Sequence, residues 1–339
     1  MELARRYCDL LTLDVTNRCN LRCRHCFNYS GEHRSERTEH TDDELIDAAK
    51  QIADIRPNTT CLCGGEPLLR KELVYELIRI IKKGGGTVNM VSNGSLLDGE
   101  CADNLKKSGV GNVQISLDGD RESHNWLRND ERSYDSAISA IENLIDAKVE
   151  TAVSCTPNVM NINKFDDLAN TLTKMGVSRL RVQPIMGLGR AKNIQDYFPS
   201  TAQYMKLSLS FANKRVSREG EILIEWVDPN KHLQTLQSGT IIKNLMINSY
   251  GDIMISPYVP VSFGNVRNHS IAEYIESGIF EVPKSNVIQK LFKTVYSNMD
   301  LVESKDSLPE LYKDELFRID VIDDSLADKY EALSQLLGC

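Results

Sequence analysis

The chain has 339 residues, 41% hydrophobic and 26% charged. This composition excludes a disordered chain and predicts one main domain with an appendage. The formal net charge is -8 and offers no basic field for a phosphate backbone, so nucleic acid is not an expected partner. No apolar run suits a membrane span or a signal peptide, so no membrane partner is expected and a cytoplasmic protein is predicted.

Short β-branched segments alternate with amphipathic segments from residue 10 onward. This alternation predicts strand–helix units wound around a parallel sheet. Six strands are expected, at residues 10–16, 59–63, 87–92, 112–119, 149–156 and 178–184. Helices are expected at residues 42–56, 71–83, 98–107, 134–147, 164–174 and 201–216. Thr41 and Glu44 have the spacing of a capping box at the start of the first helix.

The pattern changes after about residue 220. Residues 247–256 predict a β-hairpin, followed by a loop and helical segments. We therefore expect three parts. Residues 1–219 form the core, residues 220–299 form a small α+β module, and residues 300–339 form an acidic helical tail.

The cysteines give the first chemical signal. Nine cysteines without a secretory signal indicate reduced thiols, metal ligation or redox chemistry. Cys19, Cys23 and Cys26 follow the first predicted strand directly, and barrel active sites lie at the carboxyl ends of strands. Three thiolates can hold a four-iron cluster that leaves one iron open to another ligand. A zinc knuckle that also uses His25 is the alternative.

These residues resemble a known family. Residues 19–26, CNLRCRHC, have the C-x3-C-x2-C form of the radical S-adenosylmethionine (SAM) enzymes. Further matches follow the second, third and fourth strands at Gly64–Pro67, Ser92–Gly94 and Ser116–Gly119. The resemblance covers about residues 10–190 and includes the peptide-modifying branch. It implies an α/β fold, namely a partial (β/α)6 TIM-like barrel.

The resemblance also implies cofactors and the residues that bind them. One [4Fe-4S] cluster would be bound by Cys19, Cys23 and Cys26, with SAM on the open iron. Gly64, Gly65 and Glu66 would contact the methionyl ammonium of SAM. The remaining expected SAM contacts are Ser92, Asn93, Ser116, Arg128 and Ile185.

The chemistry implied by the resemblance starts with reductive cleavage of SAM. The resulting 5′-deoxyadenosyl radical takes a hydrogen atom from a ribosomal peptide or another natural product, for epimerisation or crosslinking. An external electron donor such as flavodoxin or ferredoxin is an expected partner. Two alternatives stay open: the same chemistry on a small molecule such as a sugar, nucleoside or tetrapyrrole, and a metal-binding scaffold without turnover.

Residues 248–253 and 262–266 resemble the C-terminal extension called SPASM or twitch, which carries auxiliary clusters in many peptide-modifying relatives. Its cysteines are missing here, and Tyr258 stands where such an extension places a ligand. No auxiliary cluster is therefore expected. The dozen residues before the first strand are too few for a precursor-binding domain, so a peptide is expected to need another docking surface or a separate partner.

The remaining cysteines give weaker signals. Cys155, at the end of the fifth strand, and Cys339, at the terminus, are candidate hydrogen-atom donors. Their alternatives are a small buried hydrophobe and an idle terminal thiol. Cys61 and Cys63 alternate along a strand, face the same side and are predicted to pack in the core.

Overall fold

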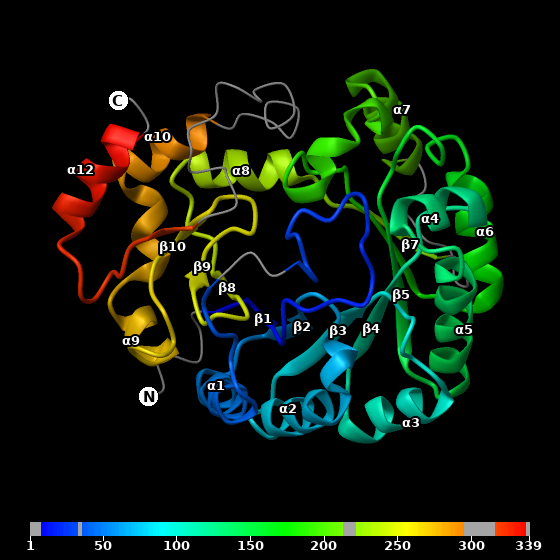
Figure 1. The fold of residues 1–339 in the computed structure, drawn as a ribbon, viewed down its shortest axis with the longest axis horizontal. Helices are drawn as coiled ribbons and strands as arrows, with labels where there is room; N and C mark the ends of the chain where they lie inside the picture. The colour runs from blue at the N-terminus through cyan, green and yellow to red at the C-terminus, as the bar shows by residue number, and fades with distance from the viewer. Residues whose placement is uncertain (1–7, 33–35, 213–221, 295–315, 337–339) are drawn as a thin grey trace.

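The structure is a computed structural model that describes residues 8–32, 36–212, 222–294 and 316–336. A curved sheet of nine strands forms its centre, in the order β7-β6-β5-β4-β3-β2-β1-β8-β9 (Figure 1). Strands β1 to β8 pair in parallel and β9 is antiparallel to β8. The α/β fold with a partial barrel is therefore confirmed.

All six predicted strands are present, and the sheet continues beyond them at both edges. The expected strands are β1 (Leu10–Asp14), β2 (Thr59–Cys63), β3 (Thr87–Ser92), β4 (Asn112–Ser116), β5 (Glu150–Cys155) and β6 (Arg179–Val182). The added ones are β7 (Leu223–Trp226), β8 (Asn244–Ile247) and β9 (Ile253–Met254). Because β8 pairs with β1, the start and the later part of the chain are joined in one sheet.

Helices cover the outer, convex side of the sheet (Figure 1). The expected ones are α1 (Asp42–Ile55), α2 (Lys71–Lys83), α3 (Gly99–Ser108), α5 (Ser133–Asp146), α6 (Phe165–Met175) and α7 (Thr201–Ala212). The predicted capping box is present at Thr41 and Glu44. Sequence reasoning missed α4 (Arg121–Arg128) and α8 (Pro229–Gln237). The predicted end of α7 lies outside the described residues.

The two faces of the sheet differ in polarity. Outward-facing residues such as Leu11, Leu62 and Val113 are fully buried against the helices. The inward-facing Gln114 and Arg181 come within 3.5 Å of each other, although β5 lies between their strands. Such a contact requires the sheet to curve around a polar interior.

Residues after 220 both extend the sheet and build a flank. The predicted hairpin is present, with Met246 opposite Met254 and Ile247 opposite Ile253. The flank contains β10 (Val261–Ser262), which pairs with β11 (Phe317–Arg318), and the helices α9 (Ile271–Glu276), α10 (Asn286–Thr294) and α12 (Leu326–Leu336). The proposed part boundaries stay predictions, and residues 300–315 lie outside the described part. No described helix is long and apolar enough to cross a membrane.

Candidate active site

The cysteine loop leaves the carboxyl end of β1 and carries all three motif thiols. Two side chains direct N–H groups at its sulfurs: Asn93 Nδ2 lies 3.9 Å from Cys19 Sγ, and Arg128 Nη1 lies 3.8 Å from Cys23 Sγ. Burial raises the pKa of Cys19 to about 11 and also raises that of Cys23. Burial therefore keeps these thiols protonated, and a metal that ligates them converts them to thiolates.

The spacing of these thiols can be compared with that of zinc ligands. In tetrahedral zinc sites the Zn–S distance of about 2.3 Å places sulfurs about 4 Å apart. Among the described residues, the only three metal-binding side chains with ligand atoms all within 4.8 Å of one another are His269, Asp320 and Asp323. At least one pair among the thiols of Cys19, Cys23 and Cys26 is therefore more than 4.8 Å apart in this structure.

Gly64 and Gly65 let the end of β2 approach the cysteine loop closely. Gly65 N donates to Thr16 O at 2.7 Å. A Cβ on Gly65 would lie 2.1 Å from Arg18 O, and one on Gly64, whose φ is +130°, would lie 2.3 Å from Thr16 O. Only glycine fits at these positions. The close approach is to the loop's own backbone, and contact with SAM stays a prediction.

Glu66 links the ends of β2 and β3. Its carboxylate is fully buried and accepts from Leu68 N at 3.1 Å, Ser92 Oγ at 2.9 Å and Asn93 N at 2.8 Å. Burial raises the pKa of this carboxyl to about 7, against the effect of these hydrogen bonds. These bonds make Glu66 orient Ser92 and Asn93, and its expected contact with the ammonium group of SAM stays a prediction.

A buried ion pair orients Arg128, at the end of α4. Arg128 Nε donates to Asp118 Oδ2 at 2.7 Å, and Thr156 N donates to Asp118 Oδ1 at 2.8 Å. Burial alone would raise the pKa of Asp118, but Arg128 and then His124 hold it well below its usual range. Sequence reasoning missed this carboxylate, although it follows Ser116 by two residues. Ser116 itself is nearly buried, at the end of β4.

The loop after β6 clamps the cysteine loop from the opposite side. Arg190 donates from its backbone N to Cys26 O at 2.9 Å and from Nε to Cys23 O at 2.8 Å. Gly189 has φ +57° and approaches so closely that a Cβ would lie 2.4 Å from Cys26 O. Sequence reasoning missed these contacts of Arg190. Ile185 is 1% exposed within a small apolar cluster, and its expected contact with SAM stays a prediction.

Of the two candidate hydrogen-atom donors, only Cys155 lies within the described residues. Cys155 is 1% exposed and lies in the hydrophobic core, on the same side of β5 as Val153. This placement favours its alternative, a small buried hydrophobe, and its donor role stays a prediction. Cys339 lies outside the described residues.

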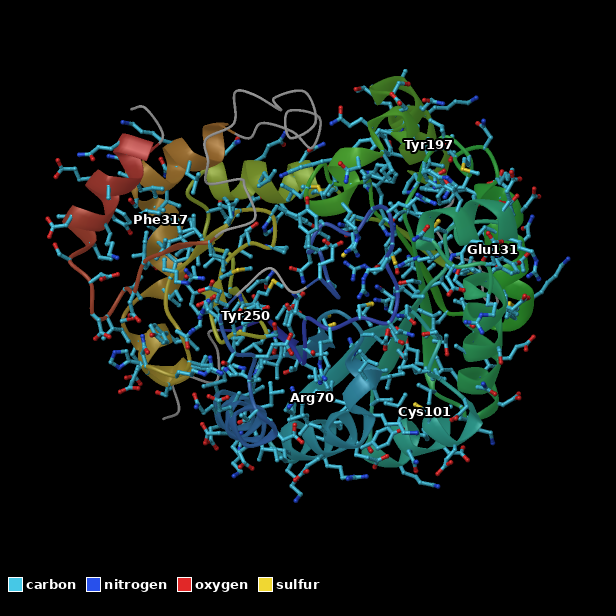
Figure 2. All side chains as sticks on the ribbon, viewed as in Figure 1. Arg70, Cys101, Glu131, Tyr197, Tyr250 and Phe317 are labelled. Atoms are coloured by element: carbon cyan, nitrogen blue, oxygen red, sulfur yellow. The ribbon has the colours of Figure 1, made fainter. Side chains whose placement is uncertain are left out.

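A cavity of about 550 Å³ separates the cysteine loop from the later part of the chain. Its wall includes Phe27, directly after Cys26, and Tyr258 and Arg318 from the opposite side. Tyr250, which also lines it, lies between the sheet and the flank that carries Phe317 (Figure 2). The cavity is therefore placed to receive a substrate beside the cysteine loop.

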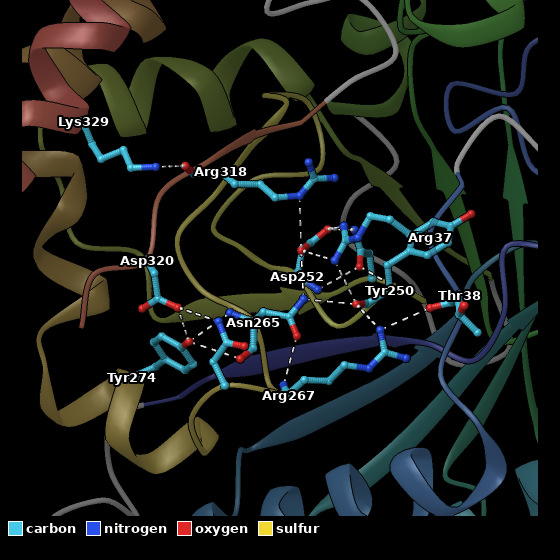
Figure 3. A network of polar contacts seen from close by, with 12 residues as sticks. Arg37, Thr38, Tyr250, Asp252, Asn265, Arg267, Tyr274, Arg318, Asp320 and Lys329 are labelled. Carbon is cyan, nitrogen blue, oxygen red and sulfur yellow. Dashed lines mark hydrogen bonds and ion pairs between the residues drawn. The ribbon is translucent and has the colours of Figure 1, made fainter. Parts of the chain in front are cut away.

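Packing and hydrogen bonds, without cysteines, hold the far wall of this cavity. The Tyr258 ring lies 6.3 Å from that of Phe27, and Gln183 Nε2 donates to its hydroxyl at 3.0 Å. Asp252, nearly buried, accepts from Nη1 and Nη2 of Arg37 and from Asn265 Nδ2 at 3.0 Å (Figure 3). This network ties the segment after the cysteine loop to the hairpin.

Comparison with known proteins shows which family the residues around this site match. Residues 13–175 match the Radical SAM superfamily. An AdoMet-dependent heme synthase of Nitratidesulfovibrio vulgaris is 30% identical over 202 residues, covering 58% of this chain and 53% of that protein. The mycofactocin maturase MftC of Mycolicibacterium smegmatis is 30% identical over 199 residues, covering 58% of this chain and 49% of that protein. The chain thus spans about half the length of these relatives.

Solved structures agree on the fold. Streptococcus suis SuiB bound to S-adenosylmethionine superposes with a TM-score of 0.65 at 14% identity, covering 79% of this chain and 65% of that one. The same protein bound to its precursor peptide SuiA gives a TM-score of 0.63 at 14% identity, covering 81% of this chain and 67% of that one. Native anSMEcpe with bound AdoMet gives 0.64 at 17% identity, covering 97% of both chains.

Proposed function

Residues 13–175 are a radical SAM domain, and from this premise we propose that Cys19, Cys23 and Cys26 hold the [4Fe-4S] cluster that this family uses with SAM. When bound, the two cofactors supply a 5′-deoxyadenosyl radical that takes a hydrogen atom from the substrate. The observation that carries the assignment is three free thiols on one loop at the carboxyl end of β1, within the residues that match the family. N–H groups of Asn93 and Arg128 also point at two of the sulfurs.

The other residues of the site orient this centre. Asp118 fixes the Arg128 guanidinium beside Cys23, and Glu66 fixes Asn93 beside Cys19. Partners of this kind determine how well a metal centre is held. We assign SAM binding to the polar rim made by Gly64, Gly65, Ser92, Asn93, Ser116 and Arg128, with Ile185 nearby. An external donor such as flavodoxin or ferredoxin would supply the electron.

We propose a ribosomal peptide, or another natural product of mixed polarity, as the substrate in the 550 Å³ cavity. Its ionisable lining comprises the carboxylates of Glu32, Glu36 and Asp252 and the guanidinium groups of Arg37 and Arg318. A tetrapyrrole with several carboxylates would find both guanidinium groups already engaged with Asp252. A peptide segment can match both signs and also cover Phe27 and Tyr258. Among the relatives, MftC is a maturase by name, whereas the other is a heme synthase by name.

The cofactor part of this proposal is tested by anaerobic reconstitution of the full chain with iron and sulfide. We expect the iron and sulfide of one cluster per chain, and 5′-deoxyadenosine when SAM and dithionite are added. Zinc in place of iron–sulfide, or no 5′-deoxyadenosine, would refute the assignment and favour a scaffold without turnover.

The substrate part is tested by deuterium transfer. Candidate peptides and an iron-porphyrin carboxylate, each deuterated, are offered to the reconstituted protein, and deuterium in 5′-deoxyadenosine is measured by mass spectrometry. We expect transfer from a peptide. Transfer from the porphyrin alone would replace the peptide proposal with the tetrapyrrole alternative.

A further inference from the structure

Cys61 and Cys63 form a thiol pair that faces the barrel interior. Both are partly exposed, and their sulfurs lie 3.4 Å apart. Leu62, between them on β2, is fully buried on the opposite face. The prediction that both cysteines pack in the core is therefore wrong. In a curved sheet, alternation along a strand does not reveal which face is concave.

Arg181 shows that these thiols point into the interior. It lies on β6, and β3, β4 and β5 separate that strand from β2 in the sheet. Its Nη1 lies 3.5 Å from Gln114 Oε1 on the concave side, the side to which Cys61 also points because it alternates with the outward-facing Leu62. A hydrogen bond from Cys63 lowers the pKa of Cys61, with Arg181 as a smaller cause, while that of Cys63 is raised. If one of the two thiols ionises, the other can donate a hydrogen bond to it, and the pKa directions favour Cys61 as the acceptor.

Asp14 completes the group from the neighbouring strand. It pairs in register with Cys63, at the last position of the β1–β2 ladder. Its carboxyl is nearly buried, and burial, followed by the charge of Glu39, raises its pKa to about 7. A carboxyl of this kind can hold or return a proton near neutral pH.

We propose that Cys63, with Cys61 as its partner thiolate, is a hydrogen-atom donor that quenches the radical left on the substrate. This inference rests on the proposed function and names a further catalytic residue for it. Gly64, which follows Cys63 directly, contacts the cysteine loop, so the thiol lies just below the strand end where the cofactors are proposed to bind. Cys155, by contrast, packs in the hydrophobic core.

The step balances as follows. The S–H bond of Cys63 breaks as a C–H bond forms on the substrate radical. The unpaired electron left on Cys63 is shared with the Cys61 thiolate as a disulfide radical anion. One electron from the external donor and one proton from Asp14 then restore the Cys63 thiol and the Cys61 thiolate. Solvent returns the proton to Asp14.

The test uses the reconstituted full chain in heavy water, with SAM and dithionite but no substrate. Without substrate, the radical takes hydrogen from whichever bond lies within reach: a C–H bond gives unlabelled 5′-deoxyadenosine, whereas a solvent-exchanged S–D bond gives the monodeuterated product. We expect the deuterated fraction of this product to fall several-fold in Cys63→Ala. The matched control is Cys101→Ala, which removes a buried thiol on α3 and should leave the fraction unchanged. An equal fraction in wild type and Cys63→Ala, or a loss only in Cys155→Ala, would overturn the proposal.

A second readout does not require the cofactors. In a full chain carrying Cys19→Ala, Cys23→Ala and Cys26→Ala, a trivalent arsenical that bridges two thiols should bind one equivalent, and adding Cys63→Ala should abolish it. If the arsenical still binds after this substitution, the claim that Cys61 and Cys63 form a thiol pair is refuted, while the proposed function is not affected. Absence of 5′-deoxyadenosine from every variant with intact motif cysteines would overturn the proposed function, and with it the donor role.

Discussion

The cysteine loop and the far wall of the cavity face each other, yet they are held by different chemistry. The loop gathers three thiols and surrounds them with buried polar partners, Asp118 with Arg128 and Glu66 with Asn93. The far wall resembles a cluster-binding extension in sequence but relies on packed rings at Tyr258 and on the Asp252 network. Under the proposed function, the polar side binds the cofactors and the packed side shapes the space for a substrate.

The largest expected effect is on the loop itself. Replacing Cys19, Cys23 or Cys26 by alanine should abolish iron–sulfide incorporation and reduce 5′-deoxyadenosine formation to background, because each removes one of three ligands. Iron analysis and chromatography of the product measure both. The matched control, Cys101→Ala, should keep both. Full activity in any of the three motif variants would show that the loop is not the cofactor site.

The next effect is on the ion pair behind the loop. Asp118→Asn leaves the buried Arg128 charge without its partner and should lower the free energy of unfolding by about 3–5 kcal/mol. It should also reduce 5′-deoxyadenosine formation roughly 10–100-fold. Urea denaturation and product assays measure the two effects. Asp135→Asn, which loosens an exposed pair with Arg121, should change little, and equal behaviour of the two variants would contradict the role given to Asp118.

Glu66→Gln should lower the free energy of unfolding by about 1–3 kcal/mol, since at least one of its three donors loses an acceptor. Burial raises the pKa of Glu66 from 4.5 to about 7, so the folded state binds its proton more tightly than the unfolded state does. This stabilisation is complete below pH 4.5 and is lost as the pH rises to about 7. Denaturation across this range should show a flatter profile for Glu66→Gln and an unaltered one for the exposed Glu72→Gln.

On the far wall, Arg37→Gln removes the guanidinium that binds Asp252. We expect a loss of about 1–3 kcal/mol in the free energy of unfolding, because Asn248 and Asn265 still donate to the carboxylate. Cluster content should not change. Arg267→Gln, whose partner Glu44 is only partly buried, is the control with a smaller expected loss. Cluster loss in Arg37→Gln would show that the two walls are not independent.

The smallest effect is expected at Tyr258. Tyr258→Phe removes the hydroxyl that accepts from Gln183 and should cost about 1 kcal/mol of unfolding free energy. Iron per chain should stay that of one cluster. A drop in iron content would show that this phenol supports a cofactor, contrary to the contrast drawn between the two walls.

Local patterns were sufficient for much of the fold and for part of the site. The six central strands follow from β-branched runs, and α1 follows from its capping box, because both signals lie within a few neighbouring residues. The spacing of Cys19, Cys23 and Cys26 likewise places three thiols on one loop. By contrast, β7 and β8 are short, and only their pairing with β6 and β1 identifies them as parts of the sheet.

The sequence by itself determined the alternation that builds the sheet and the motif that carries the thiols, since both depend on contacts between near neighbours in the chain. Tertiary structure alone decided that Cys61 and Cys63 face inward, that Arg128 is held by Asp118, and that Phe27 and Tyr258 enclose one cavity. The physical reason is curvature. Closing the sheet brings side chains from distant strands together across its concave face, and no spacing along the chain records which of them will meet there.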